Sequence, residues 1–164
     1  MFDDEDYSNI SGSGMVFKAA MFLLVKMNKG SEILLGEEIA KIVQTHSIGV
    51  AISYILGLWM LESESDILII SQLICIGFIW SMYYRINSKL GVPFVKNIFE
   101  SIGIAVCTNI AMGIVVLIAE MIIFSIVPYL GILVDTAIWG LLGYASALAS
   151  GIIYLKILAA IEAK

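Results

Sequence analysis

Two carboxylic acids stand in long apolar stretches, where an ionisable side chain is expensive to place. Glu120 is the only charged residue between positions 102 and 127, and Asp135 is the only one between 129 and 155. Each stretch exceeds the roughly 20 apolar residues that cross a bilayer core. Val127-Pro128-Tyr129-Leu130-Gly131 lies between them and is typical of a helix-breaking turn. The pattern predicts a transmembrane helical hairpin with two intramembrane acids, which by default suggest function.

The spacing of the acids predicts where they lie in this hairpin. Glu120 lies eight residues before Pro128 and Asp135 lies seven residues after it. Both are therefore about 10–12 Å from the turn, because a helix rises about 1.5 Å per residue. At about 100° per residue, Asn109 shares a helix face with Glu120, and Ser146 shares one with Asp135.

The partners of these four polar residues are expected outside the hairpin. They are the other helices, a neighbouring subunit, or water. Three readings follow for the two acids: a proton- or ion-related polar path, a structural polar contact between helices or protomers, or a shallower placement in which one acid reaches the outer interface.

Composition indicates an integral membrane protein. Of the 164 residues, 60% are apolar and 14% are charged, with a mean hydropathy of +0.99. A soluble domain has about a quarter of its residues charged. Apolar surface on this scale needs lipid as its solvent, and the length suits one domain.

Motifs for enzymatic chemistry are missing from the sequence. It contains no GxxxxGK[ST], GxSxG or HExxH pattern. His46 is the only histidine and has no second ligand at zinc-binding spacing. Cys75 and Cys107 lie within apolar segments without CxxC spacing, and we interpret them as small apolar fillers. We therefore expect a non-enzymatic protein with no catalytic residue, no metal ion and no cofactor.

The chain divides into three regions. Residues 1–14, rich in acids, Ser and Gly, are expected to form a disordered tail. Residues 15–30 combine three lysines with a short apolar run and predict a basic amphipathic helix, ended by Gly30. It would lie on an anionic leaflet or pack on the cytoplasmic end of the bundle. Residues 37–164 predict an all-α bundle of four transmembrane helices in two antiparallel hairpins, with spans at about 42–61, 67–84, 102–127 and 130–155.

The distribution of charge predicts the orientation of the spans. With four crossings, all nine Lys and Arg residues fall on one side. The acidic turn Glu62-Ser63-Glu64-Ser65-Asp66 falls on the other side, as does the turn at Pro128. Since basic residues favour the cytoplasmic side, we expect both termini in the cytoplasm.

Small residues recur every four positions in three of the predicted spans. Such stripes let helix backbones approach closely in lipid, where no hydrophobic drive brings helices together. The second and third stripes lie at similar distances from Pro128, which predicts that they form the seam of the hairpin. The stripes are Gly49/Ser53/Gly57, Gly103/Cys107/Ala111 and Gly143/Ala147/Gly151.

The order of several short motifs resembles a known family over about residues 37–158. The features are a helix carrying His46, then Asp66 and Gln72, then Gly91-Val92-Pro93-Phe94, then the turn at residues 127–131. They are similar to the GTPase-associated bacterial membrane domain of unknown function, often found behind Era-like GTPase domains. The resemblance implies a membrane module that works beside a nucleotide-binding partner, and it supplies no catalytic residues.

Two function hypotheses follow. The first is a small inner-membrane protein that acts as an anchor, adaptor or assembly subunit for a cytoplasmic partner such as a GTPase, with anionic lipid at its basic face. The second is a homo-oligomeric channel, pore or proton-linked transporter subunit that uses Glu120, Asp135, Asn109 and Ser146. No nucleic-acid partner is expected for either.

Overall fold

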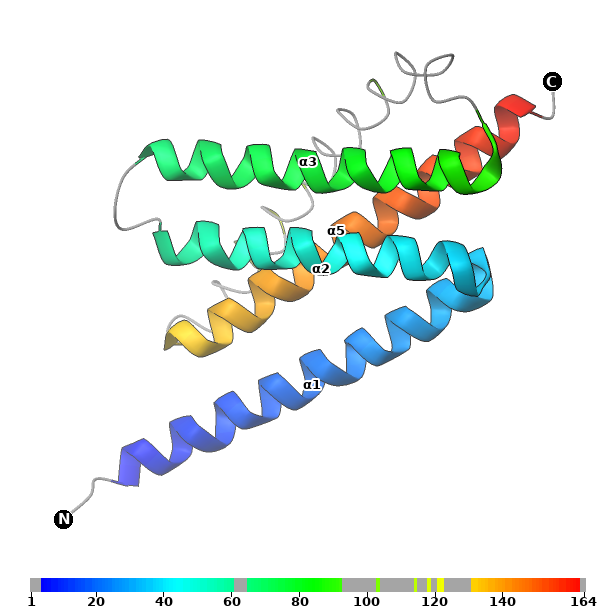
Figure 1. The fold of residues 1–164 in the computed structure, drawn as a ribbon. Coiled ribbons are helices and arrows are strands. Elements are labelled where there is room, and N and C mark those ends of the chain that lie inside the picture. Colours follow the sequence, from blue (N-terminus) through cyan, green and yellow to red (C-terminus); the bar gives the residue numbers. More distant parts are fainter. Residues whose placement is uncertain are drawn as a thin grey trace.

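The computed structural model describes residues 4–60, 65–92, 103, 114, 118, 121–122 and 131–162. Across these residues the chain is helical and contains no strand. The helices are α1 (Asp4–Leu35), α2 (Glu37–Met60), α3 (Ser65–Leu90) and α5 (Gly131–Glu162) (Figure 1). The expected all-α class is confirmed for this part of the chain.

Two of these helices are long and apolar enough to cross a membrane. They are α2, over Glu37–Trp59, and α5, over Val134–Ala160. Four crossings were expected, so the described residues account for two of them. The expected span at 67–84 lies within α3, which does not meet the same test of length and composition. The expected span at 102–127 and the turn at 127–131 lie almost entirely outside the described residues.

Two glycines end helices for a conformational reason. Gly36 and Gly91 have φ angles of 74° and 71°, in the left-handed region that other residues rarely adopt. The Gly36 amide donates to the Glu32 carbonyl, and its own carbonyl accepts from Ala40, so one residue ends α1 and begins α2. At the end of α3, Val92 donates to the Asn87 carbonyl in a Schellman arrangement.

The first helix differs from the sequence-based expectation. Residues 4–14, expected as a disordered tail, belong to α1, and the helix continues through Gly30 to Leu35. Gly30 lies mid-helix without a positive φ, and the chain first turns at Gly36. A glycine inside a helix weakens the helix by about 1 kcal/mol but need not end it. For this reason Gly30 does not end α1 as the sequence predicted.

The residues of α1 are not sorted onto an apolar face and a basic face. Phe22 lies on the same side as the lysines, and the Lys26 ammonium stands 4.6 Å from the centre of its ring. The helix contacts both α2 and α5, and it runs beside α5 from the turn at Gly36 (Figure 1). The amphipathic helix expected at residues 15–30 is thus part of a longer helix that packs along the bundle.

The core lies between α2, α3 and α5. Helix α2 has the most extensive contacts, with α3 on one side and α5 on the other. The buried core includes Val43 and Val50 of α2, Met82 of α3, and Ala147 and Leu148 of α5. Large apolar side chains also remain exposed on α2 and α3, among them Ile48, Ile52, Leu56, Trp59, Ile70, Leu73 and Phe78.

The small residues of α5 pack closely against α2. A Cβ added to Gly143 would stand 3.1 Å from the Ala51 Cα and 2.9 Å from the Tyr54 ring. One added to Gly151 would stand 2.8 Å from a Val43 methyl. Among the described residues, the close packing of the α5 stripe is against α2, and the expected seam with Gly103/Cys107/Ala111 stays a prediction. A Cβ on Gly103 meets no atom within 4 Å, and Cys107 and Ala111 lie outside the described residues.

The small residues of α2 pack against α3. A Cβ on Gly57 would lie 3.0 Å from the Ser71 hydroxyl, and one on Gly49 would overlap the Phe78 ring. Ser53, between them, is buried and donates to the Gly49 carbonyl at 2.9 Å. Helix α2 thus makes close contacts on two sides, which explains its central position.

Enlarging Gly143 is expected to weaken the bundle. The Gly143→Val variant should lose about 1–3 kcal/mol of stability, since its Cβ meets the α2 backbone and cannot be accommodated by a side-chain rotation. The measurement is thermal unfolding in detergent micelles, followed by circular dichroism. Gly77→Val on the exposed side of α3, where nothing lies within 4 Å, is the matched control. Equal melting temperatures for the two variants would contradict the assigned contact.

Candidate functional site

A cluster of polar side chains is buried between α3 and α5. The rings of Tyr83 and Tyr154 stack with their centres 4.0 Å apart and an interplanar angle of 17°. The Tyr83 hydroxyl hydrogen-bonds the Ser150 hydroxyl at 2.5 Å, and the Tyr154 hydroxyl donates to Asn87 Oδ1 at 2.9 Å. All four side chains are at most 1% exposed. We call these four residues the tyrosine cluster.

One atom of this cluster is unsatisfied. Asn87 is fully buried, and its Nδ2 has no hydrogen-bond partner among the residues that the structure describes. An amide nitrogen carries two donors, and leaving them unpaired inside a protein costs free energy. Asn87 lies at a helix end, where its backbone carbonyl accepts the closing bond of α3 from Val92.

His46 lies at the edge of the same region, between α2 and α3. Its Nδ1 is 2.7 Å from the Ile42 carbonyl, and its Nε2 is 3.2 Å from the Ser81 hydroxyl. The ring is 5% exposed. Both ring nitrogens therefore have protein partners, so His46 serves to join α2 to α3.

A second polar cluster joins α1 to α2 and α5. Gln44 Nε2 donates to the Asn28 carbonyl at 3.1 Å and to the Ser31 hydroxyl at 2.8 Å. The Tyr144 hydroxyl donates to Asn28 Oδ1, across from α5. We call these four residues the Asn28 cluster. It holds the C-terminal half of α1 against the bundle.

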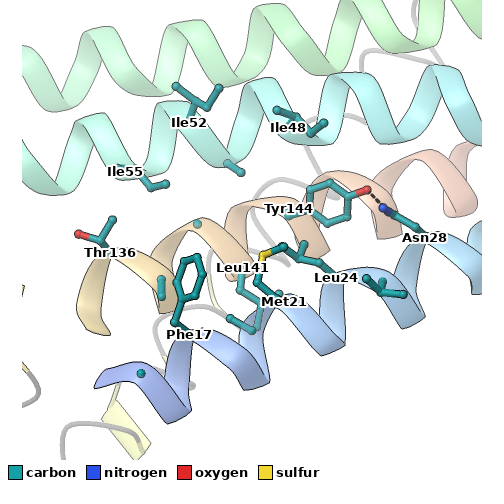
Figure 2. A pocket seen from close by; sticks show the side chains of 16 residues that line it. Phe17, Met21, Leu24, Asn28, Ile48, Ile52, Ile55, Thr136, Leu141 and Tyr144 are labelled. Atoms are coloured by element: carbon teal, nitrogen blue, oxygen red, sulfur yellow. Dashed lines mark hydrogen bonds between the residues drawn. The ribbon is translucent and has the colours of Figure 1, made fainter. Parts of the chain in front are cut away.

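An apolar groove opens between α1 and the pair α2–α5, next to the Asn28 cluster. It measures about 780 Å³, within the range of ligand-binding pockets. Figure 2 shows Phe17, Met21 and Leu24 of α1 facing Ile48, Ile52 and Ile55 of α2, with Leu141 and Tyr144 of α5 between them. The only lining side chains that carry polar atoms are Asn28, Tyr144 and Thr136. Asn28 and Tyr144 stand together at one end, and Thr136 stands at the other (Figure 2).

Two of the four polar residues predicted for the hairpin, Asp135 and Ser146, lie among the described residues. Asp135 is half-buried near the start of α5, next to Thr136, whose hydroxyl accepts from the Trp59 indole at 2.9 Å. Ser146 is buried and donates to the Gly143 carbonyl of its own helix at 2.9 Å. Between these two positions, Trp139 of the same face packs on Tyr54 with the ring centres 6.0 Å apart. Glu120 and Asn109 lie outside the described residues.

Basic side chains gather at the end of the bundle that holds the two helix-ending glycines. Lys89 of α3 and Glu38 of α2 form an exposed ion pair at 2.7 Å. Exposed Lys41, Arg85 and Lys156 lie on the neighbouring turns of α2, α3 and α5. Lys18 does not join them, because it lies 18 positions before Gly36, about 27 Å along α1. The expectation that every basic residue falls on one side of the membrane stays a prediction.

The two polar clusters and the groove were not predicted from the sequence. Asn28, Gln44, Asn87 and Ser150 are single polar residues scattered through four apolar helices. One signal was present: Tyr144 occurs deep in an apolar segment, and Tyr83 and Tyr154 occur near the ends of two others, where a buried tyrosine hydroxyl usually has a hydrogen-bond partner. The partner cannot be chosen without knowing which helices are neighbours.

Comparisons with known proteins add no relative. No protein-family model matches the chain, and neither the curated proteins nor the solved structures yield a match. Among the described side chains, no group of three His, Cys, Asp or Glu residues is placed to hold a metal ion. The resemblance to the GTPase-associated membrane domain remains a prediction.

The tyrosine cluster makes a stability prediction with an internal control. Tyr154→Phe removes the one bond that the Asn87 side chain makes to the described residues, and it should cost about 1–3 kcal/mol by leaving the buried amide without it. Replacing both partners, as Tyr154→Phe/Asn87→Leu, should restore much of that loss, because no buried polar group is then left. Thermal unfolding in detergent measures both. A double variant less stable than Tyr154→Phe alone would show that Asn87 has a further essential partner.

Proposed function

We propose that the chain is a small, non-enzymatic integral membrane protein that acts as an anchor or adaptor for a cytoplasmic partner. The observation that carries this proposal is the exposed apolar surface of the packed bundle. Trp59, Leu73 and Ile70 are more than half exposed, on helices whose other faces are buried. Water does not favour such surfaces, whereas lipid does.

Four crossings are proposed, at about 42–61, 67–84, 102–127 and 130–155. Two of them coincide with the apolar parts of α2 and α5. Helix α1 would pack along these spans with its exposed lysines, Lys18, Lys26 and Lys29, turned away from the core. The location proposed is a bacterial inner membrane.

The basic end of the bundle supports a cytoplasmic orientation. Lys41, Arg85, Lys89 and Lys156 are all exposed there, and basic residues favour the cytoplasmic side of a membrane. In this orientation both termini of the four-span region face the cytoplasm. The same surface would meet anionic lipid headgroups and a protein partner.

The cytoplasmic partner that we propose is a GTPase, and this choice rests on the sequence resemblance alone. The exposed basic end suits it, since electrostatic complementarity steers the encounter between two proteins. At this end Lys41, Arg85 and Lys156 are exposed and Lys89 is paired with Glu38, and these cations would complement an acidic surface on the partner.

A channel or transporter subunit is less well supported. The described part of its predicted polar path is interrupted, because Ser146 bonds to its own helix and Trp139 packs between it and the level of Asp135. A path that moves ions or protons needs polar groups or water in continuous contact.

The adaptor proposal predicts salt-sensitive partner binding and no ion flux. Arg85→Glu/Lys89→Glu should reduce the amount of GTP-binding protein retained on the purified chain at least tenfold, because the charge of the basic end is reversed. The amount is measured by labelled-GTP binding in the eluate. Lys18→Glu, distant from that end, is the matched control and should retain it.

Liposomes containing the purified protein distinguish the alternative. The adaptor hypothesis predicts that these liposomes show the same proton and potassium flux as liposomes without protein. Flux that is lost in Glu120→Gln and Asp135→Asn would overturn the adaptor in favour of transport. Equal retention of the GTP-binding protein by the unmodified chain and by Arg85→Glu/Lys89→Glu would remove the basic end from the proposal.

A further inference from the structure

We propose that α1 is a hinged arm, which packs on α2 and α5 in the position described above and swings away from them about Gly36 when α2 and α5 cross a bilayer. We call these the packed and the open position. The change rests on the proposed membrane insertion, and the adaptor function does not require it. Three features of α1 support it: its loose packing, the charges along it, and the turn at its end.

Little of α1 is buried in the packed position. No side chain between residues 14 and 30 is buried, and Phe17 and Val25 are 62% and 63% exposed although both line the groove. Ser31 is the one buried residue among the α1 side chains that the structure describes. A segment with few buried contacts separates from a protein at a low cost in free energy.

The contacts that hold α1 lie in its C-terminal half. Leu24, Met27 and Leu35 are partly buried against the core, and the Asn28 cluster joins α1 to α2 and α5 by hydrogen bonds. In lipid the apolar contacts contribute little, because acyl chains are as apolar as the core. Asn28 lies about 12 Å from Gly36 along α1, near the membrane surface. Water can therefore replace its partners in the open position.

Lys18 makes the packed position costly in a bilayer. It lies about 27 Å from Gly36 along α1, whereas the proposed crossing of α2 begins at residue 42, about 9 Å past Gly36. Its neighbour Phe17 lies toward the Thr136 end of the groove, away from Asn28 (Figure 2). Lys18 is exposed, so in the packed position its ammonium would face the hydrocarbon. A charge placed there is expensive.

The acidic start of α1 adds to this cost. Asp4, Glu5 and Asp6 belong to the helix and lie about 45 Å or more from Gly36 along it. This length exceeds the roughly 30 Å of a bilayer core, so the packed position would carry three acids to the side opposite the basic end. In the open position no charge of α1 enters the hydrocarbon. The exposed charged residues near the turn stay at the membrane surface in both positions and do not decide between them. They are Lys29, Glu32, Glu37 and Glu38.

Gly36 has the properties of a pivot. It is the single residue between α1 and α2, and its φ of 74° lies in the left-handed region. A Cβ added there would meet no atom within 4 Å, so no neighbouring side chain restricts the turn. Hinge motions are absorbed by a few residues at the ends of elements, and glycine changes its backbone angles with little steric resistance.

The test labels single cysteines with a membrane-impermeant maleimide, in everted inner-membrane vesicles and in spheroplasts of bacteria that produce the full chain. Cys75 and Cys107 are replaced by serine. Ser8→Cys marks the start of α1, and Ser88→Cys marks the basic end. The open position predicts that both cysteines react at least tenfold faster in the vesicles than in the spheroplasts. Reaction of Ser8→Cys in the spheroplasts, alone or in both preparations, would overturn the proposal.

A pair of buried serines tests the pivot. Ser31 of α1 and Ser47 of α2 are 1% and 0% exposed. In the open position Ser31→Cys lies in water, so it should react in the everted vesicles at least tenfold faster than Ser47→Cys, which stays inside the bundle. Equal rates would show that the Asn28 cluster holds α1 in the membrane and would overturn the pivot at Gly36. Ser8→Cys leaves that cluster intact, so the two measurements do not depend on the same variant.

Ser63→Cys, in the turn between α2 and α3, separates this inference from the proposed function. If it reacts in the spheroplasts together with Ser8→Cys, while Ser88→Cys reacts in the vesicles, the crossings stand and the arm is wrong. If all three react in the vesicles alone, α2 and α3 do not cross. The proposed membrane insertion is then wrong, and the arm falls with it.

Discussion

Close approach of α5 to α2 is the constraint on which the rest of the structure depends. At Gly143 and Gly151, the space where a side chain would begin is occupied by atoms of Ala51, Tyr54 and Val43. In lipid, apolar side chains gain little by moving from solvent to protein, so packing at such short range must supply much of the association. With α5 fixed against α2, the face of α5 that carries Ser150 and Tyr154 is directed to α3, where Tyr83 and Asn87 meet it.

Buried polar groups then complete what the glycines begin. Tyr83 and Tyr154 tie α5 to α3, His46 ties α2 to α3, and the Asn28 cluster ties α1 to both α2 and α5. A hydrogen bond inside an apolar bundle is worth about 1 kcal/mol, but an unpaired partner there costs more. Such bonds therefore select one arrangement of the helices over others with similar apolar packing. Between these ties, residues of α1, α2 and α5 line the groove.

Local features of the chain were predictable from its sequence, and the neighbours of each helix were not. The apolar segments at 42–61, 67–84 and 130–155 correspond closely to α2, α3 and α5, because a long apolar run has few alternatives to a helix. The helices extend past these limits, to Leu90 and Glu162, since a helix continues into water as long as its residues permit. Gly30 was expected to end α1 but lies inside it, because a glycine ends a helix only where the chain adopts a positive φ.

A stripe such as Gly143/Ala147/Gly151 predicts that a neighbour is close, but it does not identify the neighbour. The described neighbour is α2, which the sequence did not identify, and the hairpin seam stays a prediction. The tyrosine cluster needed the same knowledge of neighbours. Glu120 and Asn109 lie outside the described residues, so their predicted roles stay predictions.

Cross-linking in membranes tests the contact between α2 and α5 most directly. The pair Ala51→Cys/Gly143→Cys is introduced with Cys75 and Cys107 replaced by serine, and the membranes are oxidised before the protein is extracted. A disulfide is expected, because a Cβ at Gly143 stands 3.1 Å from the Ala51 Cα. The rival pair Ala111→Cys/Gly143→Cys represents the hairpin seam. A disulfide in the rival pair, with none between positions 51 and 143, would contradict the arrangement described for this bundle.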